Sequence, residues 1–415
     1  MRKVTFAFLW VFVFFIPLEN LLVFEALGTL TRVLGLVAFA VGLLAVAASG
    51  RVRVPSPVIL ISTVFFLWAF LGYQWAPSHY LAGVSVRTNI QLLGMIWLIW
   101  EFAPSAQPQR RLMAAYLCGS LATALQTIWS YLVGAGRYSM NAERFVGEGF
   151  DPNSVGVLIG LSIPMAFYLV TVYKRGYAAW AAGISCVIAC AAIPLTGSRG
   201  ASVAALAGIL LLPWSKWATS PRRKLSLAAT VLAAVAIISF AVPRTTWQRI
   251  GTIGESIASG DVGGRGAIWR AGLIVFTEHP IVGSGTAGFR RLVVPHLGAE
   301  RVAHNAFLSV LVDHGLIGLA LYLALYACLL ATILRLPALE RRISLAVLAC
   351  WLVGAMSLSL QGAKASWFVV AIVASQAVLA RGRQTKRTKT ILCRFPAHSL
   401  AVPGASRPSR TVASG

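Results

Sequence analysis

The stretch His304-Asn-Ala-Phe-Leu-Ser-Val-Leu-Val-Asp-His-Gly-Leu-Ile-Gly318 decides the organisation of the chain, because a long polar segment ends there and a long apolar helix begins. The polar segment, about residues 243–302, carries seven arginines and two histidines. Long loops without a function are uncommon, so the chemistry is predicted to lie here. From His304 the helix runs 31 residues to Leu334. That is roughly 46 Å at ~1.5 Å per residue, so its outer end should project beyond a hydrocarbon core of about 30 Å.

Composition places the chain in a membrane. Hydrophobic residues make up 58% of the 415 residues and charged residues 12%. Such a chain cannot cover its surface with polar groups as a soluble domain does. The formal net charge is +24, but the basic residues form short clusters between apolar runs and do not line one face. This pattern argues against nucleic acid as a partner and fits membrane topology.

Apolar runs long enough to span a bilayer predict an all-α integral membrane protein with about 12 transmembrane helices. Basic clusters fall on alternate connections, and the positive-inside rule assigns that side, with both termini, to the cytoplasm. Residues 1–381 are thus predicted to form one polytopic membrane domain, with the 243–302 loop outside between helices 9 and 10. Residues 382–415 form a basic tail, predicted to be disordered and to bind anionic lipids. The predicted spans lie near 4–24, 28–48, 57–74, 86–103, 112–134, 154–173, 177–195, 201–214, 225–242, 303–334, 343–361 and 365–381.

On the extracytoplasmic side, residues 136–153, 196–200, 243–302 and His304 are predicted to converge. Arginines there contradict the positive-inside bias and are costly unless something anionic meets them. A second interpretation is that they pair with the outer carboxylates. Those carboxylates are Glu143, Glu148, Asp151, Glu255, Asp261 and Glu300.

The turn Leu195-Thr-Gly-Ser-Arg-Gly-Ala201 breaks two apolar runs at their outer ends. Its glycines permit a tight turn that could present backbone N–H groups, the Ser198 hydroxyl and the Arg199 guanidinium to a phosphate. Arg199 could also simply extend to the membrane surface.

The segment Gly263-Gly-Arg-Gly-Ala-Ile-Trp269 is predicted to open a short amphipathic helix that ends near Pro280. Arg265 and Trp269 lie four apart on one face, where a purely structural cation–π contact is the alternative to ligand binding. The glycine-rich stretch 281–289 resembles a nucleotide fingerprint only superficially, because it lacks a flanking strand and a βαβ setting.

His304 stands where the outer loop meets the long helix, with Asn305 beside it. A lone histidine is more often a structural hydrogen-bonding group, but convergence with Arg199 and Arg265 favours a role as base. His314, deeper and on another face, is predicted to be a packing residue. The outer loops contain no Asp-x-Asp pair, so neither a metal nor another cofactor is expected.

Several of these motifs, in this order and spacing, resemble the O-antigen ligase and polymerase superfamily, on its ligase branch. The resemblance covers roughly residues 144–335, while the first 140 residues match only as generic membrane helices. The motifs are Arg144-Phe-Val-Gly147 with Asp151-Pro-Asn153, Thr196-Gly-Ser-Arg-Gly-Ala201, Gly264-Arg265 with Trp269, Gly283-Ser-Gly285 with Phe289, and His304-Asn305 with Gly315-Leu-Ile-Gly318.

The resemblance implies a GT-C-like membrane glycosyltransferase that moves a glycan from undecaprenyl pyrophosphate to a sugar hydroxyl of lipid A-core. The reaction would be metal-independent and inverting, at the periplasmic face of the bacterial inner membrane. Arg199 and Arg265 stand at the motifs that bind the pyrophosphate, and His304 at the motif that meets the acceptor hydroxyl. The resemblance also gives supporting roles to Arg144, Asn153, Ser198 and Asn305.

Other functions remain compatible with the sequence. An O-antigen polymerase would use the same donor and add the chain to another lipid-linked repeat. A ligase for a different polysaccharide or for protein is also possible. A lipid-linked glycan transporter is disfavoured, because transporters usually carry ionisable residues at mid-membrane depth and the predicted span centres lack them.

Overall fold

The computed structural model describes residues 1–24, 28–135, 137–139, 142–212 and 265–392, and these are almost entirely helical. Two short antiparallel hairpins, β1 (Val23–Phe24) with β2 (Gly28–Thr29) and β3 (Arg137–Ser139) with β4 (Ala142–Phe145), lie between helices. The helices are α1 (Arg2–Phe15), α2 (Leu30–Ser49), α3 (Pro57–Leu71), α4 (His79–Phe102), α5 (Ala106–Leu132), α6 (Pro152–Tyr173), α7 (Tyr177–Leu195), α8 (Arg199–Leu210), α13 (Gly266–Glu278), α14 (Gly288–Leu292), α15 (Val294–Leu297), α16 (Ala306–Leu334), α17 (Ala338–Ala355), the 3-10 turn η1 (Leu360–Gly362) and α18 (Lys364–Leu392).

The predicted spans overlap the described helices wherever the two can be compared. The ninth span, near 225–242, and residues 243–264 of the predicted loop lie outside the described residues. Six described helices are long and apolar enough to cross a membrane, which confirms the membrane class but leaves the total of twelve a prediction. They are α2, α4, α5, α6, α7 and α16. Helix α18 continues to Leu392, so the predicted tail begins with helical residues.

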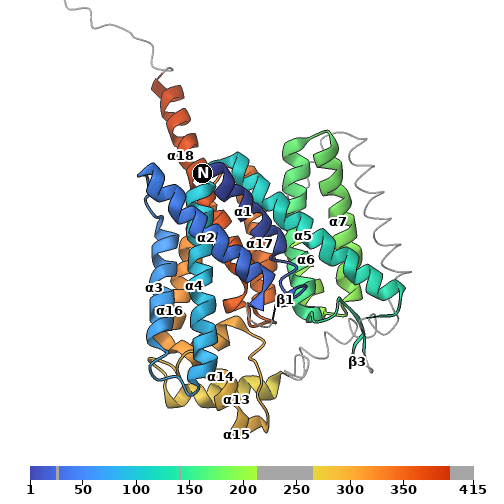
Figure 1. Ribbon diagram of the computed structural model, residues 1–415, viewed down its shortest axis with the longest axis vertical. Coiled ribbons are helices and arrows are strands. Elements are labelled where there is room, and N and C mark those ends of the chain that lie inside the picture. Colours follow the sequence, from blue (N-terminus) through green and yellow to red (C-terminus); the bar gives the residue numbers. More distant parts are fainter. Residues whose placement is uncertain (25–27, 136, 140–141, 213–264, 393–415) are drawn as a thin grey trace, which may run out of the picture.

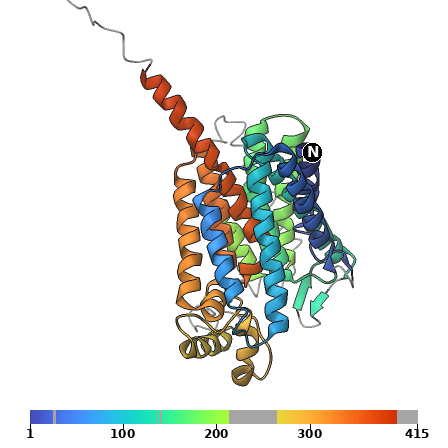
Figure 2. The same ribbon diagram turned by 60° about the vertical axis from the view of Figure 1, so that its left-hand side comes forward.

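The two ends of the helical bundle differ in character (Figures 1 and 2). The N-terminus and the far end of α18 lie at one end, and α13, α14 and α15 cover the other. Aromatic side chains mark both ends: Trp129, near the end of α5, is 65% exposed, and Trp180, near the start of α7, is 73% exposed. Large exposed aromatic residues at helix ends are typical of the two membrane interfaces.

The short helices at the loop-covered end have their own small core. Six buried apolar residues form it, and five come from the stretch from α13 to α15 and the segment just after it. Val312 of α16 joins them, so the cap of short helices is packed onto the outer part of α16. The core residues are Ala271, Val275, Phe289, Val293, Ala303 and Val312.

Helix α16 is broken at Gly315, whose backbone angles are φ 66° and ψ −167°. The prediction of one continuous helix from His304 to Leu334 is therefore wrong, because residues 306–314 form a separate outer segment. A break leaves helical backbone groups without partners, which is costly in a membrane. The loop after α13 supplies them: N–H groups of Ser284 and Gly285 donate to the carbonyls of Val312 and Asp313, and those of Leu316 and Ile317 donate to the carbonyls of Pro280 and Ile281.

Two glycines allow this backbone-to-backbone contact. A Cβ on Gly283 would lie 2.4 Å from the Gly315 nitrogen, and a Cβ on Gly315 would lie 2.2 Å from the Ile281 oxygen. Both have positive φ. The N–H groups of Ser284 and Gly285 are bonded to carbonyls of α16 and are not free to bind a phosphate. The glycine-rich stretch 281–289 therefore packs against α16, which agrees with the rejection of a nucleotide fingerprint from the sequence.

Asp313 and His314, on either side of this contact, are both buried. Asp313 accepts a 2.7 Å hydrogen bond from the N–H of Phe289, at the start of α14. The His314 ring lies edge-on to Phe65 with centroids 6.0 Å apart, which agrees with its predicted packing role. Trp68 donates from Nε1 to the His314 carbonyl at 3.0 Å.

Gly315→Ala should destabilise the fold, since the new Cβ meets backbone atoms and the conformation is one that only glycine adopts readily. Strain of this kind costs about 1–3 kcal/mol, and the clash adds to it, so we expect a loss of roughly 2 kcal/mol or more. Thermal unfolding of the purified protein in detergent measures it. Gly298→Ala is the matched control, because Gly298 has φ 70° but no atom within 4 Å of its added Cβ. Equal losses in the two variants would contradict the role of the Ile281 contact.

Candidate functional site

The turn from α7 into α8 places Arg199 at the start of α8. Gly197 has φ 62°, and Ser198 is the N-cap residue, its Oγ accepting from the Ala201 N–H at 3.3 Å. Thr196 Oγ1 accepts from the Ser198 N–H at 3.3 Å. The Ser198 side chain is thus buried in the turn and caps the helix, where the sequence suggested a hydroxyl facing a ligand. Arg199 is half-buried at the end of the turn.

The start of α6 lies against the start of α8. A Cβ on Gly156 would lie only 2.5 Å from the Ala201 Cβ, so the two helices pack closely there. Asp151 is the N-cap residue of α6, and its Oδ2 accepts from the N–H of Ser154 at 2.9 Å and from its hydroxyl at 2.7 Å. A cap of this type fixes where a helix begins. Close packing therefore brings the Asp151 carboxylate toward Arg199.

Arg144 and Asn153, predicted as supporting residues, tie these two helix starts together. The buried Arg144 donates from Nε to the Thr196 carbonyl at 3.0 Å and from Nη2 to Asn153 Oδ1 at 2.7 Å. Asn153 Nδ2 in turn donates to Asp151 Oδ1 at 3.4 Å. Arg144 thus holds the Thr196 turn and Asp151 in one hydrogen-bonded network.

Arg265 lies at the start of α13, the predicted amphipathic helix. It is the N-cap residue of this helix, which ends at Glu278. Trp269, one turn later, donates from Nε1 to the Ala303 carbonyl at 2.9 Å. The cation–π pairs within the described part of the chain do not include Arg265 with Trp269. The indole connects α13 to the residue that precedes His304.

His304 is half-buried and has a positive φ of 48°. Asn305 follows as the N-cap residue of α16, and its Oδ1 accepts from the N–H groups of Phe307 at 3.0 Å and Leu308 at 3.1 Å. His304 is therefore fixed from both sides, by the Trp269 bond to Ala303 and by the Asn305 cap.

Electrostatic interactions connect these residues into one cluster. Burial lowers the pKa of Arg265, the charge of Arg199 lowers it further, and Asp151 raises it. The pKa of His304 is lowered from 6.5, first by burial and then by Arg265, while Asp151 raises it and Arg301 adds a smaller lowering. Arg265 therefore lies within electrostatic range of Arg199, Asp151 and His304, and His304 also lies within range of Asp151.

The four groups share a structural feature. Each lies at or directly before the N-terminus of a helix: Asp151 at α6, Arg199 at α8, Arg265 at α13 and His304 before α16. A helix N-terminus carries about half a positive charge and unbonded N–H groups. The cluster therefore combines two guanidinium groups with four helix N-termini, an arrangement suited to an anion.

Asp151 is the member to which the sequence assigned no role in the site. Its segment, 136–153, was predicted to converge with the other three, and its carboxylate was among those expected to pair with arginines. Its local signal, Asp-Pro-Asn-Ser, is a recognisable helix start. Its approach to Arg265 and His304 depends on packing between α6 and α8, which no local pattern shows.

The alternative interpretation, in which outer arginines pair with outer carboxylates, holds for Arg290 and Arg291. Arg290 Nε lies 2.8 Å from Glu300 Oε2, and Arg291 Nη1 lies 3.3 Å from Glu300 Oε1. Arg270 is exposed and donates to the Gly266 carbonyl. Within the described ranges Arg265 forms no ion pair, so its charge is available to a ligand.

Carboxylates, histidines and cysteines do not gather in groups of three or more anywhere among the residues that the structure describes. Arg199 and Arg265 are cationic and Asp151 is already hydrogen-bonded, so the cluster is a poor donor set for a divalent cation. That the reaction needs no metal remains a prediction from the sequence.

The pKa of His304 provides a test that needs no substrate. It should lie below 6.5 in the wild-type protein, as followed by histidine NMR of the purified chain, with His304→Gln to assign the signal. Arg301→Gln removes a positive charge and should move this pKa upward, and Asp151→Asn removes a negative charge and should move it downward. Shifts of the same sign in both variants would contradict the proximity of these charges to His304.

Comparison with known proteins gives a family match that spans three residues of the cluster. A family model described as O-antigen ligase matches residues 184–323, which include Arg199, Arg265 and His304. The exopolysaccharide production protein ExoQ of Rhizobium meliloti (strain 1021) is 28% identical over 278 residues. This match covers 62% of the chain and 61% of that relative, less than two thirds of its length. The resemblance of the motifs is thus confirmed: residues 184–323 match the O-antigen ligase family model.

Proposed function

We propose that this protein is an O-antigen ligase that transfers a glycan from undecaprenyl pyrophosphate to a sugar hydroxyl of lipid A-core. The observation that carries the proposal is the cluster of Arg199, Arg265, His304 and Asp151 at four helix N-termini. Three of its members, Arg199, Arg265 and His304, lie within the residues that match the O-antigen ligase family model. The reaction needs a site for an anionic leaving group and a base beside it, and the cluster offers both.

Arg199 and Arg265 would hold the donor pyrophosphate. A guanidinium group binds phosphate oxygens in a bidentate manner and keeps its charge in a partly buried site. As the glycosidic bond to phosphate breaks, negative charge grows on the departing oxygen, and both arginines and the helix N-termini stabilise it. No divalent cation is required for this charge.

His304 would accept the proton of the acceptor hydroxyl. A base must be neutral before it acts, and a pKa lowered by burial and by Arg265 keeps the imidazole neutral at pH 7. Asp151, close enough to raise that pKa, would stabilise the imidazolium as it forms. Attack by the acceptor opposite the leaving pyrophosphate would invert the anomeric centre.

The same proposal includes the position of the site in the cell. The loop-covered end of the bundle would face the periplasm from the bacterial inner membrane, and both termini would lie in the cytoplasm. The basic segment after residue 381 would then contact anionic lipid headgroups of the inner leaflet.

A second candidate is a polymerase that adds the glycan to another lipid-linked repeat. The 28% identity to a protein named for exopolysaccharide production favours it, since that name specifies no lipid A-core acceptor. Donor chemistry is the same in both candidates, so only the acceptor separates them.

Replacing the cluster residues should strongly reduce transfer in cells. We expect Arg199→Lys and Arg265→Lys to reduce transfer ~100-fold, because loss of one donor to a developing oxyanion costs about 10²–10³ in rate, and His304→Ala to do at least as much. Transfer is measured from the lipopolysaccharide and the lipid-linked glycan of a host that lacks the gene and is complemented by each variant. The exposed Arg270→Lys, one turn along α13, is the matched control.

The lipopolysaccharide and lipid-linked glycan profiles of the same strains also identify the acceptor. Core without any O-antigen, with long lipid-linked polymer accumulating, supports the ligase. Core that carries a single repeat supports the polymerase. If both pools are unchanged in the deletion host, glycan transfer from this donor is contradicted.

Trp269→Phe should reduce turnover by roughly 5- to 10-fold, because the Ala303 carbonyl loses a hydrogen bond of about 1 kcal/mol and His304 loses its fixed position. The KM for the donor should change little, since the arginines remain. The exposed Trp129→Phe is the control. A raised donor KM with unchanged turnover would instead place Trp269 in donor binding.

A further inference from the structure

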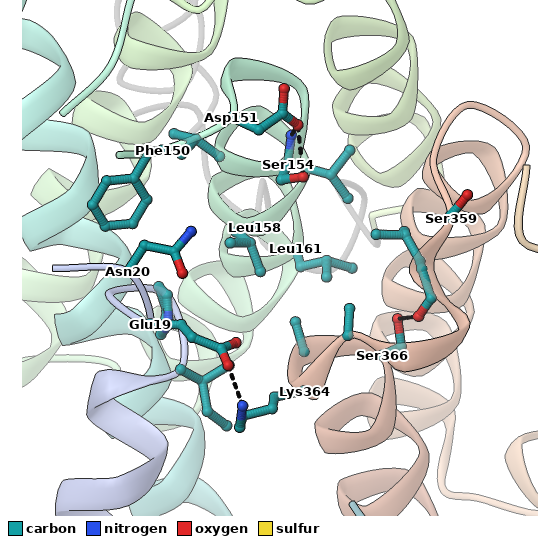
Figure 3. Close-up of a pocket in the computed structure, with 17 residues that line it drawn as sticks. Glu19, Asn20, Phe150, Asp151, Ser154, Leu158, Leu161, Ser359, Lys364 and Ser366 are labelled. Carbon is teal, nitrogen blue, oxygen red and sulfur yellow. Dashed lines mark hydrogen bonds and ion pairs between the residues drawn. The ribbon is translucent and has the colours of Figure 1, made fainter. Parts of the chain in front are cut away.

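A cavity of about 210 Å³ lies beside the cluster, between the segment after α1, the first half of α6 and the start of α18 (Figure 3). Its polar wall includes Glu19, Asn20, Asp151, Ser154, Ser359 and Lys364. Its apolar wall includes Leu158 and Leu161 of α6. Carboxylate, amide and hydroxyl groups are thus arranged around an apolar floor.

The charge of this cavity is opposite to that of the arginine cluster. Lys364 is only 7% exposed and forms an ion pair with Glu19. Asp151 contributes a second carboxylate, so these three charged residues carry a formal charge of −1 (Glu19 −1, Asp151 −1, Lys364 +1). A phosphate would be repelled, whereas hydroxyl groups could donate to the carboxylates and accept from the ammonium.

The size of the cavity limits its ligand. Pockets for drug-sized ligands are usually ~300–1,000 Å³, so about 210 Å³ suits a single ring and not a chain of several. An isoprenoid chain is also a poor match, because its hydrocarbon would exclude water from a wall with three charged side chains, those of Glu19, Asp151 and Lys364.

Asp151 connects the cavity to the reacting groups. It lines the cavity and also acts on the pKa of both Arg265 and His304. A ligand in the cavity therefore lies next to the position proposed for the pyrophosphate and the base.

We propose that this cavity binds one uncharged sugar ring of a glycan substrate, next to the bond that is made or broken. Its hydroxyls would donate to Glu19 and Asp151 and accept from Asn20 and Lys364. The inference rests on the glycosyl transfer proposed above. The ring could belong to the donor glycan or to the acceptor, because both present the same hydroxyl chemistry.

Filling the cavity tests the proposal. Leu158→Trp brings a larger ring in from α6, and Asn20→Ala removes an amide from an exposed position whose hydrogen bond, 3.4 Å to the Gly149 carbonyl, is long. Leu60→Trp makes the same size change on α3, where Leu60 is exposed and does not line the cavity. Each full-length variant is assayed in nanodiscs with lipid-linked glycan from the parent strain and lipid A-core from a strain lacking O-antigen.

We expect the KM for one substrate to rise about 10-fold or more in Leu158→Trp and several-fold in Asn20→Ala, with Leu60→Trp unchanged. A raised acceptor KM assigns the ring to the acceptor, and a raised donor KM assigns it to the donor glycan. Unchanged KM values for both substrates in Leu158→Trp and Asn20→Ala would overturn the proposal.

A binding measurement separates this inference from the proposed function. Oligosaccharide released from the donor by mild acid should raise the melting temperature of the wild-type protein, and less so that of Asn20→Ala. Arg265→Lys should lose turnover but keep this stabilisation. If Arg265→Lys turns over as the wild type does, the transfer mechanism fails while the sugar site stands, and if the oligosaccharide stabilises wild type and Asn20→Ala equally, the sugar site fails alone.

Discussion

The hydrogen bonds across the break in α16 are the constraint on which the outer part of the protein depends. Backbone groups in a membrane must find partners within the protein, so a break in a spanning helix is tolerated only where another segment supplies them. Here the loop after α13 does so, through a contact that two glycines allow. The contact anchors the end of α13 to α16. The position of Arg265, at the other end of α13, relative to His304 therefore depends on backbone bonds that lie eight or more residues from either.

The candidate site concentrates positive charge, and this has a cost. Burial lowers the pKa of Arg265, repulsion from Arg199 lowers it further, and the helix N-termini add to the positive potential. The Asp151 carboxylate offsets part of this positive potential, but it also caps α6. An anion placed between the arginines would relieve the repulsion, so such a site favours binding of a charged ligand before any chemistry occurs. The same positive potential, together with burial, favours the neutral form of the His304 imidazole.

Hydropathy and motifs in the sequence predicted the helical membrane class, the α13 helix, and the approach of Arg199, Arg265 and His304. They could not predict the break at Gly315, because residues 306–334 form one apolar run and an isolated glycine is ordinary in such a helix. The Glu19–Lys364 pair joins residues 345 positions apart, and Ser198 faces inward because it caps α8. Each of these features depends on packing between distant elements. Local sequence patterns carry no information about such packing.

Two neighbouring regions of opposite charge would determine the orientation of a ligand bound in the site. The arginines and helix N-termini would attract the pyrophosphate of the proposed donor, while the cavity beside them has a formal charge of −1 among its three charged residues and suits neutral hydroxyls. A glycan linked to a pyrophosphate has this same division between an anionic and an uncharged part. Such a ligand would be bound with its phosphates toward Arg199 and Arg265 and a sugar toward Glu19 and Lys364, because the reverse orientation would put phosphate against carboxylate. The bond that joins the two parts would then lie near Asp151, where the two regions meet and where His304 is close enough to act.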